Sequence, residues 1–350
     1  MIRLNTSFNM RIYSRIRSCL SDKNKGTLTR FLIEAGLKPK VNRKVNSPFK
    51  KGIIIFSADL EMAWAFRYSK TRKNETVKKG LEERENIPVL LDLFQKYNIP
   101  VTWATVGHLF LSDCSKGPDG LAHSALPRPG YFENRNWNFS FGDWYQHDPC
   151  TNVFNDPAWY ASDLIEKIIS SDVKHEIGCH TFSHTDFTYK NCPKSLADAE
   201  LDECIKHAEN LNISLRSMVF PGGTSGNYES LVERGFASYR KPMKNHIDLP
   251  SIDKYGLVVI PSSIGLDRDR YGWTREFHLK MIRSYIEEAA KRRLVCHFWF
   301  HPSMDRWYLE NVMPEVLKMV DDYVESSKIE VKTMGELAEG YKDLTAVKRK

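Results

Sequence analysis

The sequence lacks the features that mark membrane-spanning and disulfide-stabilised proteins. No run approaches the about 18 consecutive apolar residues that a transmembrane helix requires, so no membrane span is expected. The seven cysteines are odd in number and scattered, without a Cys-x-x-Cys pair, which indicates reduced thiols and a cytoplasmic protein. No internal repeat or low-complexity tract is present. At 350 residues, 41% hydrophobic and 27% charged, the chain has the composition of a globular protein with one large domain or two ordinary ones.

Positive charge is concentrated at the start of the chain. Residues 1–51 contain 13 Lys and Arg against 2 Asp and Glu, a net charge of +11, whereas the rest has 38 against 42, a net charge of −4. Apolar residues recur every four positions between arginines, as in an amphipathic basic helix: Leu4, Phe8, Ile12, Ile16 and Leu20. We expect residues 1–50 to form a basic, partly helical extension that packs on the following domain or lies peripherally on an anionic membrane surface. It lacks the apolar core of a secretory signal peptide, and no nucleic-acid-binding fold accompanies its charge, so no nucleic-acid partner is expected.

Strand-like and helix-like patterns alternate beyond this extension. Strands are expected near 52–58, 100–106, 175–179, 216–220, 235–240, 256–261, 294–300 and 329–332. Helices are expected near 81–98, 158–171, 195–211, 226–234, 274–292, 308–326 and 333–341. This repeating order predicts a largely parallel sheet with helices outside it.

Two histidines are spaced so that they could bind one metal ion. His180 and His184 are four positions apart, and on a helical turn such side chains lie about 5–6 Å apart at Cβ, close enough to share zinc. A solvated or buried histidine pair without metal is the alternative. His297 and His301 have the same spacing, but their segment looks like a strand, in which four residues span about 13 Å and cannot share an ion.

A pair of carboxylates follows the first expected strand. The apolar run from Gly52 ends at Asp59 and Glu61, which face the same side of a strand because its side chains alternate with a period of two. Glu61 with His180 and His184 would form a set of two histidines and one carboxylate, which leaves a position open for water. Asp59 is then free to act as a general base, although the two carboxylates could exchange roles.

These residues, taken in order, resemble the polysaccharide deacetylase family, also called the NodB homology domain or carbohydrate esterase family 4. The most specific match is His180-Thr181-Phe182-Ser183-His184 with its Glu-Ile-Gly lead-in, and the likeness runs over about residues 51–340. Ser57-Ala58-Asp59-Leu60-Glu61 is similar to the family's Asp-x-Glu variants rather than to its usual Thr-Phe-Asp-Asp-Gly. The resemblance implies an α/β fold, a distorted (β/α) barrel over residues 51–341, followed by a basic tail at 342–350.

The resemblance also implies roles for residues near the later strands. His301, in a strand that ends in His-Pro, corresponds to the general acid that protonates the leaving amine. The family's third motif carries an Arg that pairs with the catalytic Asp, but the matching segment before Pro221 has none. Arg240 could replace it or be an ordinary surface arginine. A backbone N–H near Pro221, Gly222 and Gly223 would stabilise the oxyanion, unless the three residues form only a tight turn.

Residues 112–158 do not follow the strand–helix rhythm. This segment is rich in Pro, Gly and aromatic residues and is a long connection of the kind that often carries function. We expect it to overhang the mouth of the barrel, where an aromatic side chain such as Trp144 contacts a sugar ring or packs the base of the loop. His123 and His147 lie in the same segment and are expected to be surface or packing histidines.

The combined hypothesis is a metal-dependent N-deacylase, a deacetylase or deformylase, with one divalent ion, most simply Zn²⁺. The expected substrate is an N-acyl amino sugar of a lipid-linked or nucleotide-linked precursor of a surface polysaccharide such as lipopolysaccharide O-antigen. The expected location is cytoplasmic, with the extension placing the chain against the inner face of the membrane. Two alternatives stay open: a metal-free amidohydrolase that acts on a small cyclic amide, and a catalytically inactive sugar-binding module.

Overall fold

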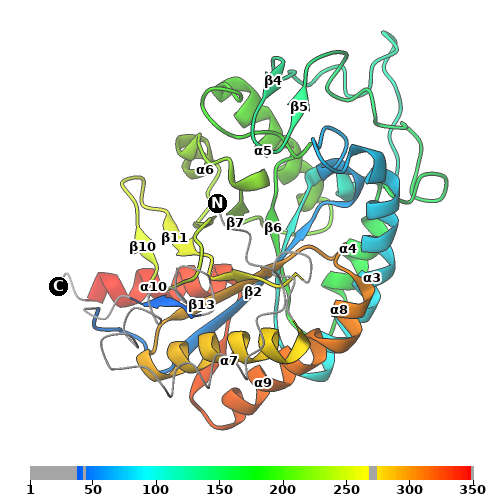
Figure 1. Cartoon of the computed structure of the whole chain (residues 1–350). Helices are drawn as coiled ribbons and strands as arrows, with labels where there is room; N and C mark the ends of the chain where they lie inside the picture. Colours follow the sequence, from blue (N-terminus) through cyan, green and yellow to red (C-terminus); the bar gives the residue numbers. More distant parts are fainter. Residues whose placement is uncertain (1–37, 42–44, 268–273, 348–350) are drawn as a thin grey trace.

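The computed structural model describes residues 38–41, 45–267 and 274–347 (Figure 1). The amphipathic pattern expected between Leu4 and Leu20 therefore lies outside the described residues. Strand β2 (Gly52–Leu60) is central to the fold, and every one of its residues is buried. Its β-branched and aromatic residues suit a strand that is covered on both faces.

Within the described residues, ten strands form one curled sheet. Their order is β10-β11-β8-β7-β6-β3-β2-β13-β12, and β14 also pairs with β2. The neighbours of β2 are parallel to it, and only β10 pairs antiparallel, with β11. The remaining bounds are β3 (Thr102–Thr105), β6 (Glu176–Cys179), β7 (Ser217–Val219), β8 (Ser238–Lys241), β10 (Ser251–Ile252), β11 (Val258–Pro261), β12 (Ile264–Gly265), β13 (Val295–Phe300) and β14 (Ile329–Val331). The expected distorted α/β barrel is confirmed.

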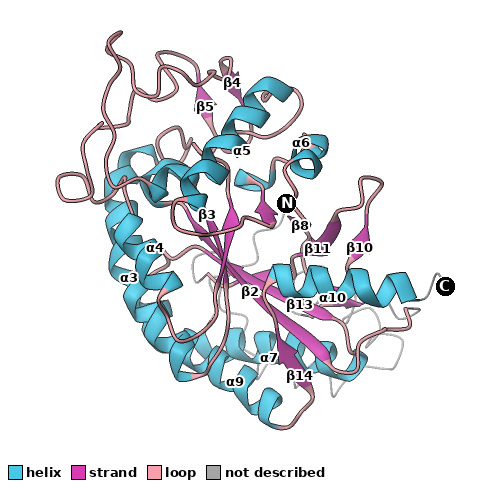
Figure 2. Ribbon diagram, turned by 180° about the vertical axis from the view of Figure 1, so that it is seen from behind, coloured by secondary structure: helices cyan, strands magenta, loops and turns pink. Residues whose placement is uncertain are grey.

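Helices pack around the strands, as Figures 1 and 2 show. Their bounds are α3 (Thr76–Lys96), α4 (Ser162–Ile169), α5 (Lys194–Glu209), α6 (Tyr228–Glu233), α7 (Arg275–Arg292), α8 (Arg306–Asn311), α9 (Met313–Glu325) and α10 (Met334–Val347). Short 3-10 turns occupy η1 (Met62–Ala65), η2 (Lys73–Glu75), η3 (Gly107–Phe110) and η4 (Pro221–Gly223). No helix among the described residues is long and apolar enough to cross a membrane.

Two expected helices differ from the observed ones. The single helix expected at 308–326 is divided into α8 and α9, because Pro314 lies in the first turn of α9 and has no N–H with which to continue α8. Helix α10 continues to Val347, through most of the segment expected to be a basic tail.

The insertion, residues 112–158, contains little regular structure. Only β4 (Phe132–Glu133) and β5 (Asn138–Phe139) form a short antiparallel pair within it. Two further two-residue strands, β1 (Lys40–Val41) and β9 (His246–Ile247), join the start of the described chain to the barrel. The described cysteines are all free thiols, and Cys179 is fully buried.

Candidate active site

The side chains of Glu61, His180 and His184 converge at the carboxyl edge of the sheet. Parallel pairing in register brings the ends of β2, β3 and β6 together, because Asp59 pairs with Ala104 and Thr105 with Cys179. Glu61 Oε1 lies 2.9 Å from His180 Nε2 and 3.1 Å from His184 Nε2. The Nδ1–H of His180 donates to the Val219 carbonyl oxygen at 2.7 Å, which directs Nε2 toward Glu61.

The two histidines lie on a loop after β6, not on the helical turn that their spacing suggested. Thr181 has a φ of 60° and His184 a φ of 55°, values that exclude a right-handed helix. The Thr181 hydroxyl instead accepts the backbone N–H of Thr185 at 3.1 Å and closes a tight turn. The expected helix was therefore wrong, although the loop still brings both Nε2 atoms to one carboxylate.

Asp59 faces a different partner from Glu61. Arg240, on β8, donates from Nη1 to Asp59 Oδ1 and from Nη2 to Asp59 Oδ2, each at 2.6 Å. The same guanidinium donates to the Ser57 hydroxyl at 2.9 Å, and that hydroxyl lies 2.8 Å from His297 Nε2. Arg240 is buried, so it is a bidentate partner of Asp59 rather than a surface arginine.

His301 completes the group from the end of β13. Its Nε2 lies 3.6 Å from Glu61 Oε2 and 3.9 Å from Asp59 Oδ2. Its side chain is 38% exposed, whereas those of Asp59 and Glu61 are about 5% exposed. Glu61 and His301 border a cleft of about 530 Å³ whose walls also carry Arg72, Lys79, Glu82, Asp305 and Arg306. This volume lies within the about 300–1,000 Å³ typical of small-ligand sites.

Burial and neighbouring charges shift the pKa values of a carboxylate and two histidines at this site. Burial raises the pKa of Glu61, but the nearby charges of His301 and His184 and the hydrogen bonds from His180 and His184 outweigh it and hold that pKa well below its usual range. Burial lowers the pKa of His184. Burial, aided by the charge of Arg240, holds the pKa of His297 well below its usual range. These shifts favour the ionised form of Glu61 and the neutral form of His184, the forms in which both groups bind metal ions.

Several supporting residues are not apparent from the sequence. Glu83, on α3, accepts the backbone N–H of Glu61 at 2.8 Å, and burial followed by the charge of Glu61 holds the pKa of Glu83 well above its usual range. Arg67 donates to the Ser183 carbonyl oxygen at 2.6 Å, and Glu200, on α5, accepts the Ser183 backbone N–H at 2.8 Å. No motif or spacing marks these side chains, since each acts through a hydrogen bond to a residue at least 17 positions away.

Trp144 is buried at the base of the insertion. Its side chain is buried, stacks on Tyr68, and donates from Nε1 to the Ser183 hydroxyl at 2.7 Å. It packs the base of the insertion and is not exposed to the cleft. Trp137, also from the insertion, lies edge-on to His184 with ring centroids 5.2 Å apart.

The Pro221–Gly223 segment forms the 3-10 turn η4. Gly222 has a φ of 56°, and a Cβ there would lie 2.7 Å from the Trp137 ring. Gly223 N–H donates to Phe220 and Thr224 N–H to Pro221, each at 3.0 Å, so the turn engages both of these donors. Of the expected oxyanion donors in the described turn, only Gly222 keeps an N–H that is not used in this way.

Comparison with known proteins agrees with this architecture. Residues 75–234 match the family model for polysaccharide deacetylase. A search of curated protein sequences finds no match. The fold is similar to that of a Mycobacterium smegmatis protein described as a polysaccharide deacetylase, with a TM-score of 0.59 and 14% identity over 88% of this chain and 96% of that one.

Two further solved structures share the fold. A Pseudomonas aeruginosa PAO1 protein described as a polysaccharide deacetylase gives a TM-score of 0.53 at 14% identity, over 82% of this chain and 89% of that one. Puue allantoinase gives a TM-score of 0.52 at 13% identity, with the same coverage of 82% and 89%. The structural likeness concerns the fold, whereas the match over residues 75–234 is to the polysaccharide deacetylase family model, which is typical of hydrolases that act on amide bonds.

Proposed function

We propose that this chain is a metal-dependent N-deacylase that removes an acetyl or formyl group from an amino sugar. The observation that carries the proposal is the convergence of Glu61, His180 and His184, whose donor atoms lie within 4.8 Å of one another. Two imidazole nitrogens and one carboxylate oxygen are a ligand set that zinc takes in catalytic sites. The ring of His180 is already oriented by Val219, as a metal ligand's ring usually is by an outer partner.

A divalent ion held by these three residues would polarise the acyl carbonyl and lower the pKa of water toward about 7. Asp59 is the proposed general base and accepts the proton of the attacking water. Arg240 keeps that carboxylate in place through two hydrogen bonds, and each oxygen retains a further lone pair for the incoming proton. The partners of the two carboxylates support this assignment, since Glu61, unlike Asp59, contacts both His180 and His184.

His301 is the proposed general acid. Its ring is the most exposed of the group and borders the cleft, where the leaving nitrogen of a bound substrate would lie. Proton transfer from His301 to that nitrogen accompanies C–N cleavage, and the products are a free amine and acetate or formate. The N–H of Gly222 is the proposed backbone donor to the oxyanion.

The substrate proposed is an N-acyl amino sugar of a lipid-linked or nucleotide-linked glycan precursor. A cleft walled by charged side chains of both signs suits a hydroxyl-rich ligand better than an apolar one. The basic residues before the barrel would favour a precursor carried at an anionic membrane. The cytoplasmic location proposed earlier rests on the scattered, reduced cysteines.

The proposal is tested by metal analysis together with activity. Full-length protein is incubated with a panel of N-acetyl and N-formyl amino sugars, and the release of free amine is followed before and after chelation and zinc addition. We expect His180→Ala and Glu61→Ala each to lose one equivalent of metal and all activity, and Asp59→Asn to keep the metal but turn over about 10²–10⁴-fold more slowly. His207→Ala, on α5, is the matched control.

Other outcomes would assign a different function. Activity on a cyclic amide that survives chelation would identify the metal-free amidohydrolase. Sugar binding with no turnover in the zinc-loaded protein would identify the inactive binding module. Full metal content in both His180→Ala and His184→Ala would rule out the proposed metal site formed with Glu61.

A further inference from the structure

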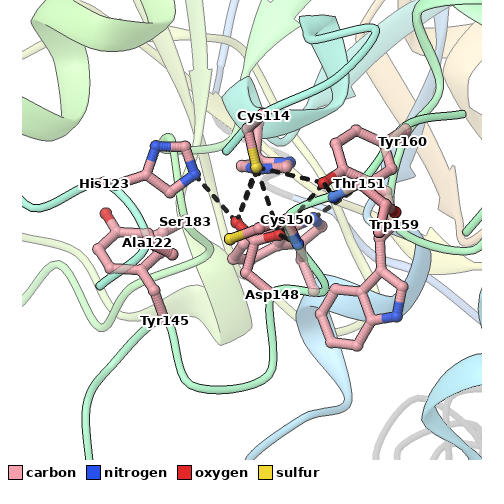
Figure 3. Close-up of polar contacts among 12 residues, drawn as sticks. Cys114, Ala122, His123, Tyr145, Asp148, Cys150, Thr151, Trp159, Tyr160 and Ser183 are labelled. Carbon is pink, nitrogen blue, oxygen red and sulfur yellow. Dashed lines mark hydrogen bonds and ion pairs between the residues drawn. The ribbon is translucent and has the colours of Figure 1, made fainter. Parts of the chain in front are cut away.

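A second cluster of potential metal ligands joins the insertion to η3 of the barrel, and Figure 3 shows its insertion residues. One member comes from η3, directly after β3, and the other three come from separate points of the insertion. The four residues are His108, Cys114, His123 and Asp148. One potential ligand atom from each residue lies within 4.8 Å of those of the other three, although 40 positions separate the first residue from the last.

Asp148 is the centre of this cluster. Its Oδ2 lies 3.0 Å from His108 Nε2 and 3.0 Å from His123 Nε2. The sulfur of Cys114 lies 3.5 Å from both carboxylate oxygens. Ligand atoms bound to one tetrahedral zinc at 2.0–2.3 Å are about 3.3–3.8 Å apart, so these separations are near those of a zinc site.

His108 carries the second observation that points to a ligand. Its side chain is fully buried, and neither ring nitrogen makes a hydrogen bond of ordinary geometry, although Nε2 lies 3.0 Å from Asp148 Oδ2. Buried polar atoms without such a bond are rare and indicate an absent partner, for example an ion. The ring is clamped between aromatic neighbours, with Trp64 at 4.3 Å and Phe182 at 5.7 Å between ring centroids.

Outer partners hold the other ligands. The backbone N–H of Cys150 donates to Asp148 Oδ1 at 2.9 Å, which leaves Oδ2 to face the two histidines. The Tyr160 hydroxyl lies 3.2 Å from the Cys114 sulfur and accepts the Thr151 N–H at 2.9 Å. These contacts fix ligand orientation in the manner of a metal site's surroundings.

The backbone is also held in an unusual state here. His123 and Cys150 both have a φ of 49°, a region that side-chain-bearing residues rarely adopt. Such conformations persist where surrounding contacts over-determine them. A metal ion held by four chain segments would supply that constraint in an insertion whose only regular structure is one pair of two-residue strands.

We propose a structural zinc site that fastens the insertion to the barrel, with four ligands: His108, Cys114, His123 and Asp148. The set contains nitrogen, sulfur and oxygen donors suited to zinc, and four protein ligands leave no position for water, unlike the candidate active site. The cluster also supports the loop that carries His180 and His184. The N–H groups of Gly107 and His108 donate to the carbonyl oxygens of Thr181 and Phe182 at 2.8 and 2.9 Å.

The test separates this ion from the one proposed for catalysis. Full-length His180→Ala/His184→Ala protein, in which the candidate active site is disabled, is loaded with zinc, dialysed and analysed for metal. We expect one zinc per chain. Cys114→Ser in that background should reduce it to none, whereas Cys150→Ser, a neighbouring thiol outside the ligand set, should keep it.

Cobalt gives an independent reading in the otherwise unmodified chain. Only the second cluster contains a cysteine, so cobalt bound there should produce a thiolate-to-cobalt absorption band in the near ultraviolet. That band should disappear in Cys114→Ser and persist in Cys150→Ser and in His180→Ala/His184→Ala. Absence of the band from cobalt-loaded protein, or zinc retention by Cys114→Ser, would overturn the proposal. So would a Cys114–Cys150 disulfide found by thiol titration of metal-free preparations, because it would consume the sulfur ligand.

Discussion

At the scale of single residues, the pairing of Asp59 with Arg240 is the feature on which the proposed chemistry depends most. A planar guanidinium makes two parallel hydrogen bonds to a carboxylate, which an ammonium group cannot reproduce. The Arg240 guanidinium also lies 5.2 Å from the centroid of the Trp299 ring, and this contact helps to hold the orientation of the guanidinium. Arg240 therefore supplies both a fixed orientation and a positive charge beside the proposed base.

Arg240→Lys should separate these two contributions. The positive charge remains, but the bidentate geometry is lost, and a displaced base is expected to lower kcat by about 10²-fold. Metal content should stay at the wild-type level because Arg240 contacts none of the proposed ligands. Steady-state kinetics and metal analysis check this, with Lys241→Arg on the same strand as the control. Unchanged kcat in Arg240→Lys would show that the pair is only structural.

The sequence predicted part of this arrangement. Asp59, Glu61 and His301 follow apolar strand-like runs, and parallel strands end at one edge, so their proximity follows from a local pattern. Arg240 could be suggested but not assigned, since its contact with Asp59 depends on the pairing of Val219 with Arg240 between β7 and β8. Arg67, Glu83 and Glu200 could not be found, because buried long-range hydrogen bonds leave no periodic signal in sequence.

At the scale of elements, the loop after β6 shows why spacing alone misled. A separation of four residues is compatible with a helical turn and with a tight loop, and the positive φ values of Thr181 and His184 cannot be read from residue type. The loop is fixed instead through Ser183, which contacts Trp144, Arg67 and Glu200. Three distant elements thus hold the segment between the two histidines.

Ser183→Ala should loosen this loop. Loss of the hydroxyl leaves buried groups of Trp144 and Glu200 without their partner, which costs about 1–3 kcal/mol of stability. Metal affinity at the candidate active site should fall about 10–100-fold, as it does when outer partners of ligands are removed. Chelator competition and urea unfolding measure the two effects.

Thr185→Val is the matched control for this loop. The Thr185 hydroxyl is buried on the same loop without a hydrogen-bond partner, so its removal should leave both measurements near wild type. Equal behaviour of Ser183→Ala and Thr185→Val would argue against a positioning role for Ser183.

At the scale of the whole molecule, alternation of strands and helices predicted the barrel, because each βα unit is a local pattern whose assembly follows from burying apolar faces. The insertion could not be predicted in the same way. Its contacts join residues far apart in the chain, and His123, expected to be a surface or packing histidine, lies beside Asp148. Irregular segments take their structure from such specific contacts rather than from periodicity.

Stability of the barrel should depend on pH through His175. Burial lowers the pKa of His175 to about 4 from an ordinary value of about 6.5, and its Nδ1 accepts the Val101 N–H, which requires the neutral ring. The stabilisation is therefore present above about pH 6.5 and is lost as pH falls toward 4, a change of about 3 kcal/mol. Urea unfolding at pH 7 and 4.5 should show a smaller loss in His175→Gln than in wild type. An equal loss in both would remove His175 as a source of acid sensitivity.

The basic segment before the barrel should govern attraction to membranes without affecting catalysis. Residues 1–37 contain 7 Lys and Arg against 2 Asp and Glu, whereas β1 pairs with β9 and Phe49 is buried against the barrel. Deletion of residues 1–37 thus removes charge but leaves the described contacts intact.

Each basic residue near an anionic surface contributes about 1 kcal/mol, and this attraction weakens as salt screens it. Full-length protein should sediment with anionic vesicles at low salt and be released by added salt, while the truncated protein should stay in solution with unchanged turnover of a water-soluble N-acyl sugar. Vesicles of zwitterionic lipid provide the control, and equal sedimentation of both proteins with anionic vesicles would assign the segment a role other than membrane attraction.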